Sequence, residues 1–202
     1  MSFFQNTCKP KGTGGKIMVN MMNSGHSSMA EWGFTHIEIA ENNICLDIGC
    51  GGGANVKKLL EKSPHGKVTG IDYSEISVEK SQKINKAEIS NKRCKILQGN
   101  VMELPFENET FDVITAFETI YFWSDIDQSF SQIYRVLKKG GIFMVCNESN
   151  GENDKDKKWT EIIKGMKIYT SKEIKYSLEK AGFTHIETNK NAKGWLCVVA
   201  RK

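Results

Sequence analysis

The chain has 202 residues, of which 39% are hydrophobic and 26% are charged, and it contains 3 prolines. This is the composition of an ordinary globular protein, and it excludes a disordered, collagen-like or low-complexity chain. The 28 Lys and Arg residues outnumber the 24 Asp and Glu residues only slightly, and the formal charge of +4 is scattered, so the charge gives no indication of nucleic-acid binding.

Neither a membrane segment nor a metal-binding cysteine pattern is visible. No apolar run approaches the roughly 18 residues that span a bilayer, and residues 1–15 lack the pattern of a signal peptide. We therefore expect a cytoplasmic protein without membrane insertion. Six cysteines are widely spaced and form no C-x-x-C pair, so we expect no metal site and no disulfides. We expect reduced, mostly buried thiols at positions 8, 45, 50, 94, 146 and 197.

The first predicted elements precede an alternating pattern. Residues 17–40 are rich in Met and predict one or two short helices around a break at Ser24-Gly25, which would lie over the open end of a sheet. From residue 44 to 147, short apolar runs alternate with amphipathic ones, which is typical of a parallel sheet with crossover helices. Strands are predicted at 44–48, 67–71, 94–98, 111–117 and 142–146. Helices are predicted at 54–63, from the N-cap Ser74 to about residue 89, and at 125–138, with Lys138, Lys139 and two glycines ending the last one.

The final third of the chain predicts a helix and a strand pair. Residues 147–167 are polar and indicate a surface excursion. Thr170 and Glu173 form a capping-box pattern at the start of a helix that ends at Gly182, and strands follow at 183–188 and 195–200. We expect a single domain, with a cap segment at 1–43, a ligand-binding core at 44–147 and a C-terminal helix and strand pair at 148–202.

A glycine-rich turn follows the first predicted strand. Gly49, Gly51 and Ala54 match the G-x-G-x-x-G/A pattern of dinucleotide-binding turns, whose glycines let a ligand approach the backbone. Asp72 ends the second strand, near where a ribose-binding carboxylate belongs. This spacing alone leaves nicotinamide and other adenosine-containing ligands open.

Asp47 narrows the choice among adenosine-containing ligands. An ionised carboxylate inside a buried parallel strand costs several kcal/mol unless it is paired. We therefore expect Asp47 to lie near the carboxyl end of its strand and to face a ligand ammonium, the alternative being hydrogen bonds from nearby backbone N–H groups. A ligand that offers ribose, adenine and an amino-acid end is S-adenosylmethionine.

At this point the chain resembles the class I S-adenosylmethionine-dependent methyltransferases that act on small molecules. LDIGCGGG resembles the first motif of that family, GIDYS the acidic end of its second strand, GNVMELPFENETFDVITAFETIYFW its third and fourth motifs, and RVLKKGGIFMV its fifth. The resemblance covers residues 44–147 in order. It implies an α/β fold, a doubly wound, Rossmann-like sheet of seven strands, mostly parallel with an antiparallel last strand. The helices predicted before the sheet add an N-terminal helical cap to this fold.

The resemblance also implies roles for individual residues. Gly49, Gly51 and Gly53 would surround the methionine part of the cofactor, Asp72 would bind the ribose hydroxyls and Val101 would contact adenine. Cofactor contacts are thus predicted from ten residues of these motifs: Asp47, Gly49, Cys50, Gly51, Gly53, Asp72, Tyr73, Asn100, Val101 and Phe117. The product of the cofactor would be S-adenosylhomocysteine.

Asn100 departs from the family pattern. Family members commonly carry an acidic residue there, whose carboxylate accepts a hydrogen bond from the adenine amino group. The Asn side-chain oxygen can still accept that bond, without the assistance of a charge. The alternative is that Asn100 only shapes the turn after the third strand.

The acceptor side is predicted from the cap and from the end of the fourth strand. His26 follows the break in the cap and is the candidate general base, since an imidazole can take a proton near neutral pH; the alternative is a His bonded to backbone or solvent. Methyl transfer needs such a base only for acceptors that hold their proton tightly. The residues predicted to contact the substrate are Asn23, His26, Trp32, Glu118, Tyr121 and Trp123, although aromatic clusters also occur as simple packing.

The predicted function is methyl transfer to a small-molecule, lipid-like or quinone-like acceptor by in-line displacement. Neither an N/D-P-P-Y/F/W motif nor a Pro-Cys pair of nucleic-acid methyltransferases occurs. A nicotinamide-dependent oxidoreductase is the alternative enzyme, weakened by Asp47 and by the missing Y-x-x-x-K pair. A non-catalytic domain that binds S-adenosylmethionine to regulate a partner is the third reading. We expect a monomer or a weak homodimer.

Overall fold

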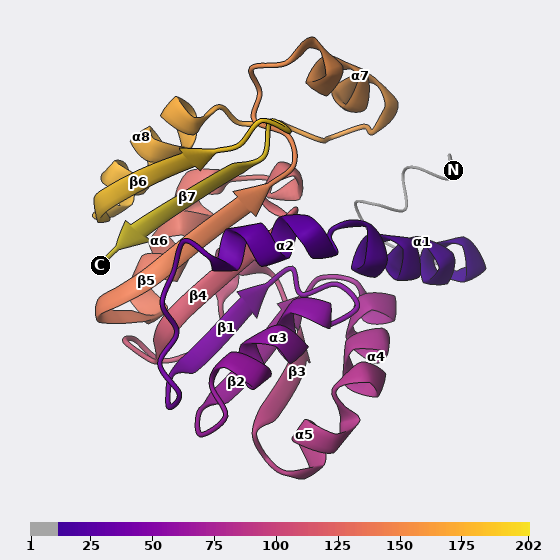
Figure 1. The fold of residues 1–202 in the computed structure, drawn as a ribbon, viewed down its shortest axis with the longest axis vertical. Coiled ribbons are helices and arrows are strands. Elements are labelled where there is room, and N and C mark those ends of the chain that lie inside the picture. Colours follow the sequence, from indigo (N-terminus) through magenta and orange to yellow (C-terminus); the bar gives the residue numbers. More distant parts are fainter. Residues whose placement is uncertain (1–11) are drawn as a thin grey trace.

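The computed structural model describes residues 12–202, except the side chains at positions 13, 16, 20–24, 154, 155 and 157. Within that part of the chain, seven strands form one sheet in the order β3-β2-β1-β4-β5-β7-β6 (Figure 1). The strands are β1 (Ile44–Ile48), β2 (Lys67–Asp72), β3 (Cys94–Gln98), β4 (Phe111–Phe117), β5 (Leu137–Asn147), β6 (Thr184–Lys190) and β7 (Leu196–Arg201). β1 to β5 pair in parallel, whereas β7 is antiparallel to both of its neighbours. This confirms the predicted sheet with its antiparallel last strand.

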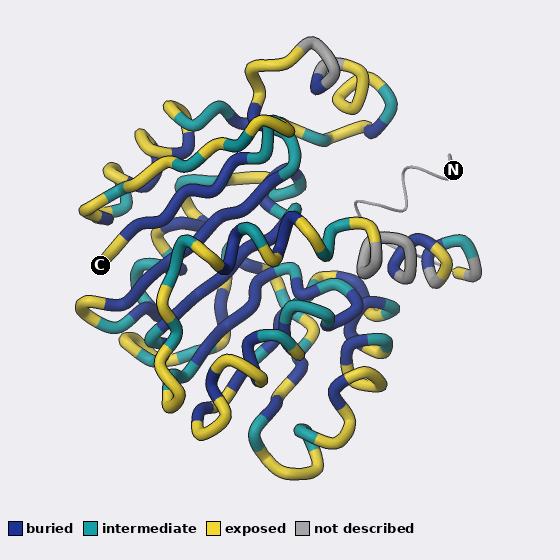
Figure 2. Tube along the Cα trace, in the orientation of Figure 1, coloured by how far each residue is buried: buried dark blue, intermediate teal, exposed yellow. Residues whose placement is uncertain are grey.

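Helices cover both faces of the sheet. One face packs against α2 (Ser27–Phe34), α3 (Ala54–Lys62) and α4 (Glu75–Ile84), and the other against α6 (Ile126–Val136) and α8 (Ser171–Ala181). The other described helices are α1 (Gly12–Gly25), α5 (Lys86–Ser90) and α7 (Asp154–Ile162), with short 3₁₀ turns at Val101–Glu103 and Ile120–Phe122. Because both faces are covered, the central strands are buried almost throughout, as the dark blue tube in Figure 2 shows.

The helix starts that the sequence predicts are present. Ser74 and Asp125 each accept a backbone N–H three residues later in their helices. Thr170 and Glu173 form the reciprocal capping box, in which each side chain accepts the backbone N–H of the other residue. Gly182 ends the same helix in the left-handed conformation, with φ of 100°.

The junction between α6 and β5 differs from the prediction. The helix expected over 125–138 ends at Val136, and Lys138, Lys139 and the two glycines lie in β5 instead of terminating a helix. Leu137 pairs with Phe111 of β4, and the Gly140 N–H donates to the carbonyl of Lys202 at 2.9 Å. Pairing with neighbouring chain segments therefore replaces the last helical turn and lengthens the strand beyond the predicted 142–146.

The second predicted helix is also interrupted. It was expected to run from Ser74 to about residue 89, but α4 ends at Ile84 and α5 begins at Lys86. Between them, the buried amide of Asn85 donates hydrogen bonds to the carbonyls of Gly53 and Ser81. This side chain therefore ties the break in the helix to the glycine-rich turn.

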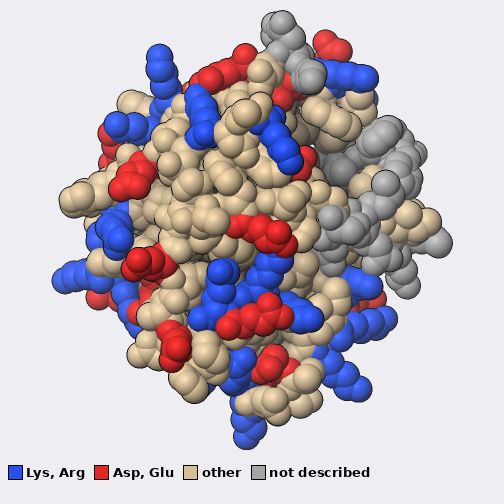
Figure 3. Space-filling view, in the orientation of Figure 1, with Lys and Arg blue, Asp and Glu red and all other residues tan. Residues whose placement is uncertain are grey.

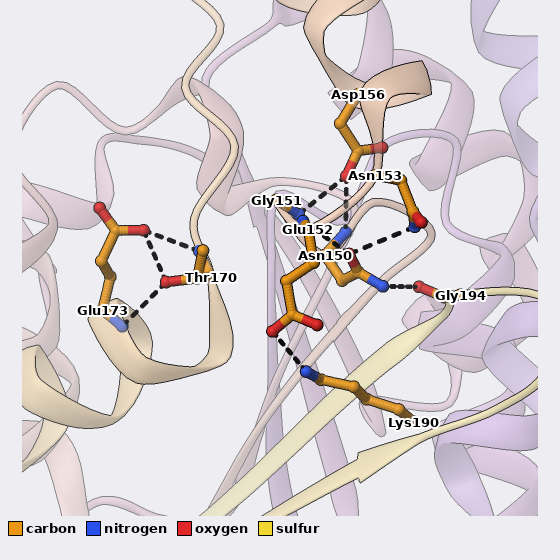
Figure 4. A network of polar contacts seen from close by, with 9 residues as sticks. All are labelled: Asn150, Gly151, Glu152, Asn153, Asp156, Thr170, Glu173, Lys190 and Gly194. Atoms are coloured by element: carbon orange, nitrogen blue, oxygen red, sulfur yellow. Dashed lines mark hydrogen bonds and ion pairs between the residues drawn. The ribbon is translucent and has the colours of Figure 1, made fainter.

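A polar network anchors the segment after β5 (Figure 4). The carboxylate of Asp156 accepts the N–H groups of Asn150 and Gly151 at 3.2 and 2.8 Å, and the Asn150 amide donates to the Gly194 carbonyl at 2.8 Å. Lys190 of β6 pairs with Glu152 at 2.5 Å. The predicted surface excursion thus contains α7 and is held to the β6–β7 turn from its first residues.

The distribution of charge on the surface and the burial of the cysteines are those expected from the sequence. On the face in Figure 3, Lys and Arg side chains are interspersed with Asp and Glu. No helix in the described part of the chain is long and apolar enough to cross a membrane. The cysteines within residues 12–202 are free and buried, as predicted, whereas Cys8 lies outside the described residues.

Candidate functional site

A pocket of about 460 Å³ opens where β1, β2 and β4 end. Its walls come from the glycine-rich turn before α3, from the residues that follow β2, β3 and β4, and from the cap helices α1 and α2. The volume lies within the roughly 300–1,000 Å³ that is usual for small-molecule sites. The carboxyl edge of a parallel sheet is where open α/β folds bind their ligands.

The glycine-rich turn presents its backbone to this pocket. Gly49 and Gly51 have φ of 68° and 51°, and their N–H groups donate to the Ile71 carbonyl and to Asp72 Oδ2, both at 2.8 Å. A Cβ on Gly49 would lie 2.1 Å from Thr119 Oγ1, whereas a Cβ on Gly51 would meet no atom closer than 4.0 Å. Gly49 is therefore needed for packing, and Gly51 is where a missing side chain leaves room for a ligand.

Gly53 does not line the pocket. A Cβ there would lie 2.3 Å from Ser81 Oγ and 2.6 Å from Asn85 Nδ2, both on the side of α4. With φ of 84°, Gly53 also occupies the N-cap position of α3. Gly53 is therefore needed for close packing of the turn on α4, and its predicted cofactor contact stays a prediction.

Asp47 also lies outside the residues that line the pocket. Its side chain is 2% exposed, and the Thr115 hydroxyl of the neighbouring strand β4 donates to its Oδ1 at 2.7 Å. Burial raises the pKa of Asp47 to about 7, against the opposing effect of this hydrogen bond. A hydroxyl of this chain thus supplies part of the compensation expected for the buried carboxylate, and the predicted contact of Asp47 with a ligand ammonium stays a prediction.

The other predicted cofactor residues lie together at the pocket. Asp72 receives N–H bonds on both oxygens, from Gly51 on one and from Ser74 at 2.8 Å on the other, and burial raises its pKa. Tyr73 lies at the rim with more than half of its surface exposed. The residues of the predicted cofactor set that line the pocket are Gly49, Cys50, Gly51, Asp72, Tyr73, Asn100, Val101 and Phe117.

Asn100 performs the turn-shaping role considered as its alternative. It precedes the 3₁₀ turn at Val101–Glu103, and its Oδ1 accepts the Met102 N–H at 3.1 Å. The same oxygen is the one that would accept an adenine amino group. Both roles are compatible with the structure because an amide oxygen has two lone pairs.

Three side chains converge at the cap side of the pocket. His26 lies between α1 and α2, and its Nδ1 is 3.9 Å from Glu118 Oε2 and 3.4 Å from Glu148 Oε1. Burial on its own would lower the pKa of His26, but the close approach of Glu148 and the charge of Glu118 outweigh burial and raise it. The predicted role of His26 as a general base stays a prediction.

Glu118 is held firmly in this group. It follows β4 with a left-handed backbone, φ of 55°, and its Oε1 accepts the Tyr121 hydroxyl at 3.0 Å and the Glu148 N–H. Burial raises the pKa of Glu118 to about 7, although the charge of His26 opposes the change. Its second oxygen, Oε2, is directed to His26.

Not all predicted acceptor contacts meet here. His26, Glu118 and Trp123 line the pocket. Tyr121 is 2% exposed and belongs to the hydrophobic core, so it reaches the site only through Glu118. Trp32 packs edge-on against His36, with ring centroids 4.7 Å apart, and beside Trp195, away from the pocket lining. The side chain of Asn23 lies outside the described residues.

The structure adds residues that the sequence did not single out. Lys58 lines the pocket from the second turn of α3, and its Nζ donates at 3.2 Å to the carbonyl and to the hydroxyl of Ser27 on α2. Thr119 lines the pocket beside Gly49. Helical spacing could have identified Lys58, because it lies one helical turn after Ala54 and Asn55, which also line the pocket.

Comparisons with known proteins place this geometry in context. A family model described as a methyltransferase domain matches residues 39–182. The sterol 4-C-methyltransferase strm-1 of Caenorhabditis elegans is 33% identical over 182 residues, which is 85% of this chain and 52% of that protein. The chain spans about half the length of the curated relatives that it matches first.

Solved structures share the fold. A Haloferax volcanii structure of the Trm112 methyltransferase activator with its methyltransferase partner has a TM-score of 0.82 at 21% identity, covering 91% of this chain and 93% of that chain. A SAM-dependent methyltransferase from Aquifex aeolicus has a TM-score of 0.76 at 20% identity, covering 92% and 97%. At these identities, the likeness is one of fold.

Proposed function

Because this chain belongs to the methyltransferase-domain family, we propose that it transfers a methyl group from S-adenosylmethionine to a small-molecule acceptor. The observation that carries the proposal is the open space at Gly51 beside the carboxylate of Asp72, at the sheet edge where β1 and β2 end. When bound, S-adenosylmethionine supplies an electrophilic methyl group on a sulfonium centre.

The residues of the pocket fit that ligand at its two ends. The first turn of α3 begins at Ala54, directly after the glycine-rich turn, so its free N–H groups suit the carboxylate of the methionine part. Asp72 would accept the ribose hydroxyls, and Asn100 and Val101 would contact the adenine. Asp47 lies two residues before Gly49 and outside the pocket lining, and in its ionised form it would add negative charge near the ammonium.

The acceptor is proposed to be a small and largely apolar molecule. Phe117, Phe122 and Trp123 line the pocket on the side of Glu118 and supply aromatic surface. The name of the Caenorhabditis elegans relative describes a sterol acceptor, which agrees with such surface. In an in-line displacement, the chain contributes by holding the acceptor in line and by excluding water.

Ligand binding and methyl transfer together test the proposal. Isothermal titration should give saturable binding of S-adenosylmethionine and S-adenosylhomocysteine and none of NAD. Incubation with the donor carrying a labelled methyl group, and with sterol and other lipid extracts, should transfer the label to a small molecule. Binding of NAD alone would favour the oxidoreductase. Binding of the donor without transfer to any extract would favour a regulatory domain.

A further inference from the structure

We propose that His26, Glu118 and Glu148 form a binding site for one divalent transition-metal ion beside the pocket. Each of the three offers one ligand atom, and these atoms lie within 4.8 Å of one another. They come from three separate places in the fold, namely the junction of α1 and α2, the end of β4 and the end of β5. Cysteine and histidine spacing could not reveal such a site.

The distances suit a shared ion. Ligand atoms that bind one ion at about 2.0–2.2 Å lie about 3–4 Å from one another, and His26 Nδ1 lies 3.4 and 3.9 Å from the two carboxylates. Nδ1 is a buried atom, and the two carboxylates are its partners in the structure, so an ion between them would replace these ion pairs. His26 occupies the N-cap position of α2 without using its side chain as a cap, so the imidazole is available.

The carboxylate of Glu118 is held in position before any ion binds, and the backbone beside Glu148 is anchored. On Glu118, Oε1 is occupied by the Tyr121 hydroxyl and by the Glu148 N–H, which leaves Oε2 directed to His26. The chain just after Glu148 is fixed by the network around Asn150 (Figure 4). Hydrogen bonds that orient ligand groups in this way are a regular part of protein metal sites.

The ligand set indicates the class of ion. Two carboxylates and a neutral imidazole carry a charge of −2, which a divalent ion neutralises. Mg²⁺ and Ca²⁺ prefer all-oxygen sites, whereas a nitrogen ligand favours Mn²⁺, Fe²⁺ or Zn²⁺. Three protein ligands leave coordination positions open, and His26 and Glu118 line the pocket, so an oxygen atom of the acceptor or a water can complete the shell.

Manganese binding tests this site without any methyl transfer. The electron paramagnetic resonance signal of free Mn²⁺ would be followed while the full chain is titrated, and Mg²⁺ would be added as a competitor. We expect one Mn²⁺ per chain, displaced poorly by Mg²⁺. His26→Gln and Glu148→Gln should each weaken Mn²⁺ binding by at least about tenfold.

A matched control separates the site from general surface charge. Glu152→Gln removes a carboxylate four residues further along, which pairs with Lys190, and should leave Mn²⁺ affinity unchanged. Tyr121→Phe, which keeps the core packing but removes one of the two hydrogen bonds to Oε1 of Glu118, should weaken binding by about tenfold. Melting curves would establish that all four variants are folded.

The proposal is overturned if the chain shows no saturable Mn²⁺ binding at millimolar concentration, or if Glu148→Gln and His26→Gln bind as the unmodified protein does. It goes beyond the proposed function and can fail independently of it. Glu148 is not among the residues that line the pocket, so Glu148→Gln should still bind S-adenosylhomocysteine.

Discussion

Thr115 on β4 donates its hydroxyl to the carboxylate of Asp47 on β1, at 2.7 Å and in direct register across the two strands. One hydrogen bond compensates only part of the cost of burying this acid, since burial still raises the pKa of Asp47 to about 7. Between about pH 4 and about pH 7, the folded protein therefore retains a proton on Asp47 that an unfolded chain would release.

This proton makes stability depend on pH. An unfolded Asp ionises near pH 4, whereas folded Asp47 ionises near pH 7, so the folded state binds more protons between these values. The free energy of unfolding should therefore fall as the pH rises from about 4 to about 7. Asp47→Asn keeps an acceptor for Thr115 and should make this fall shallower, although Glu118 and Asp72, whose pKa values burial also raises, still contribute to it. The variant should be more stable than the unmodified chain by on the order of 1–3 kcal/mol at pH 8. Urea denaturation at several pH values measures both; parallel pH curves for the two proteins would contradict the prediction.

Substitutions at two glycines of the turn should have different effects, one mainly on ligand binding and the other mainly on stability. In Gly51→Ala the new methyl group points into the open pocket, so S-adenosylhomocysteine binding should weaken by at least about tenfold, while the left-handed backbone costs roughly 1 kcal/mol of stability. In Gly53→Ala the methyl group meets Ser81 and Asn85, and the loss of stability should exceed about 2 kcal/mol. Calorimetric titration and thermal unfolding of both variants would show the contrast. Equal losses in both measurements would place the two glycines in the same role.

Asn100 offers a test of adenine recognition. Asn100→Asp introduces the acidic residue that the family resemblance led us to expect at this position, and its carboxylate can still accept the Met102 N–H. A charge-assisted bond to the adenine amino group should tighten S-adenosylhomocysteine binding by roughly 1 kcal/mol, or about fivefold in Kd. Asn100→Ala serves as the opposite case and should weaken it. An Asp variant that binds no better than the Ala variant would remove this side chain from adenine recognition.

Lys58 should hold the cap helix in place. It bridges from α3 to Ser27 on α2, so Lys58→Met should speed hydrogen exchange of the α2 amides and weaken cofactor binding. Lys57→Met is the neighbouring control, because Lys57 is exposed and its Nζ pairs with Glu61 within α3. Mass spectrometry of exchanged peptides would compare the two variants. Identical exchange in α2 would leave the cap independent of Lys58.

Features set by local sequence could be predicted, and features set by distant contacts could not. Ser74, Asp125 and Thr170 cap helices within three residues of themselves, so pattern alone located these starts. The start of β5 depends on the pairing of Leu137 with Phe111, which no local pattern encodes.

The same reason limited the prediction of the site. The order of the motifs predicted at which edge of the sheet the pocket lies. Whether a side chain at Gly53 would collide with α4 depends on the position of that helix, which the motifs do not give. Glu148 was missed because its meeting with His26 joins residues more than a hundred positions apart. Asp47 was identified as a buried acid, yet its partner on β4 became visible only with the strand register.

Because Gly53 packs against α4, the glycine-rich turn is in contact with that helix on the side that faces away from the pocket. Ser81 occupies the volume that a side chain on Gly53 would need, although it does not line the pocket. Enlarging Ser81 would push the turn forward, so affinity for the methyl donor can be tuned by a residue that the donor never meets. Homologues with bulkier α4 residues at this point should have turns displaced toward the ligand.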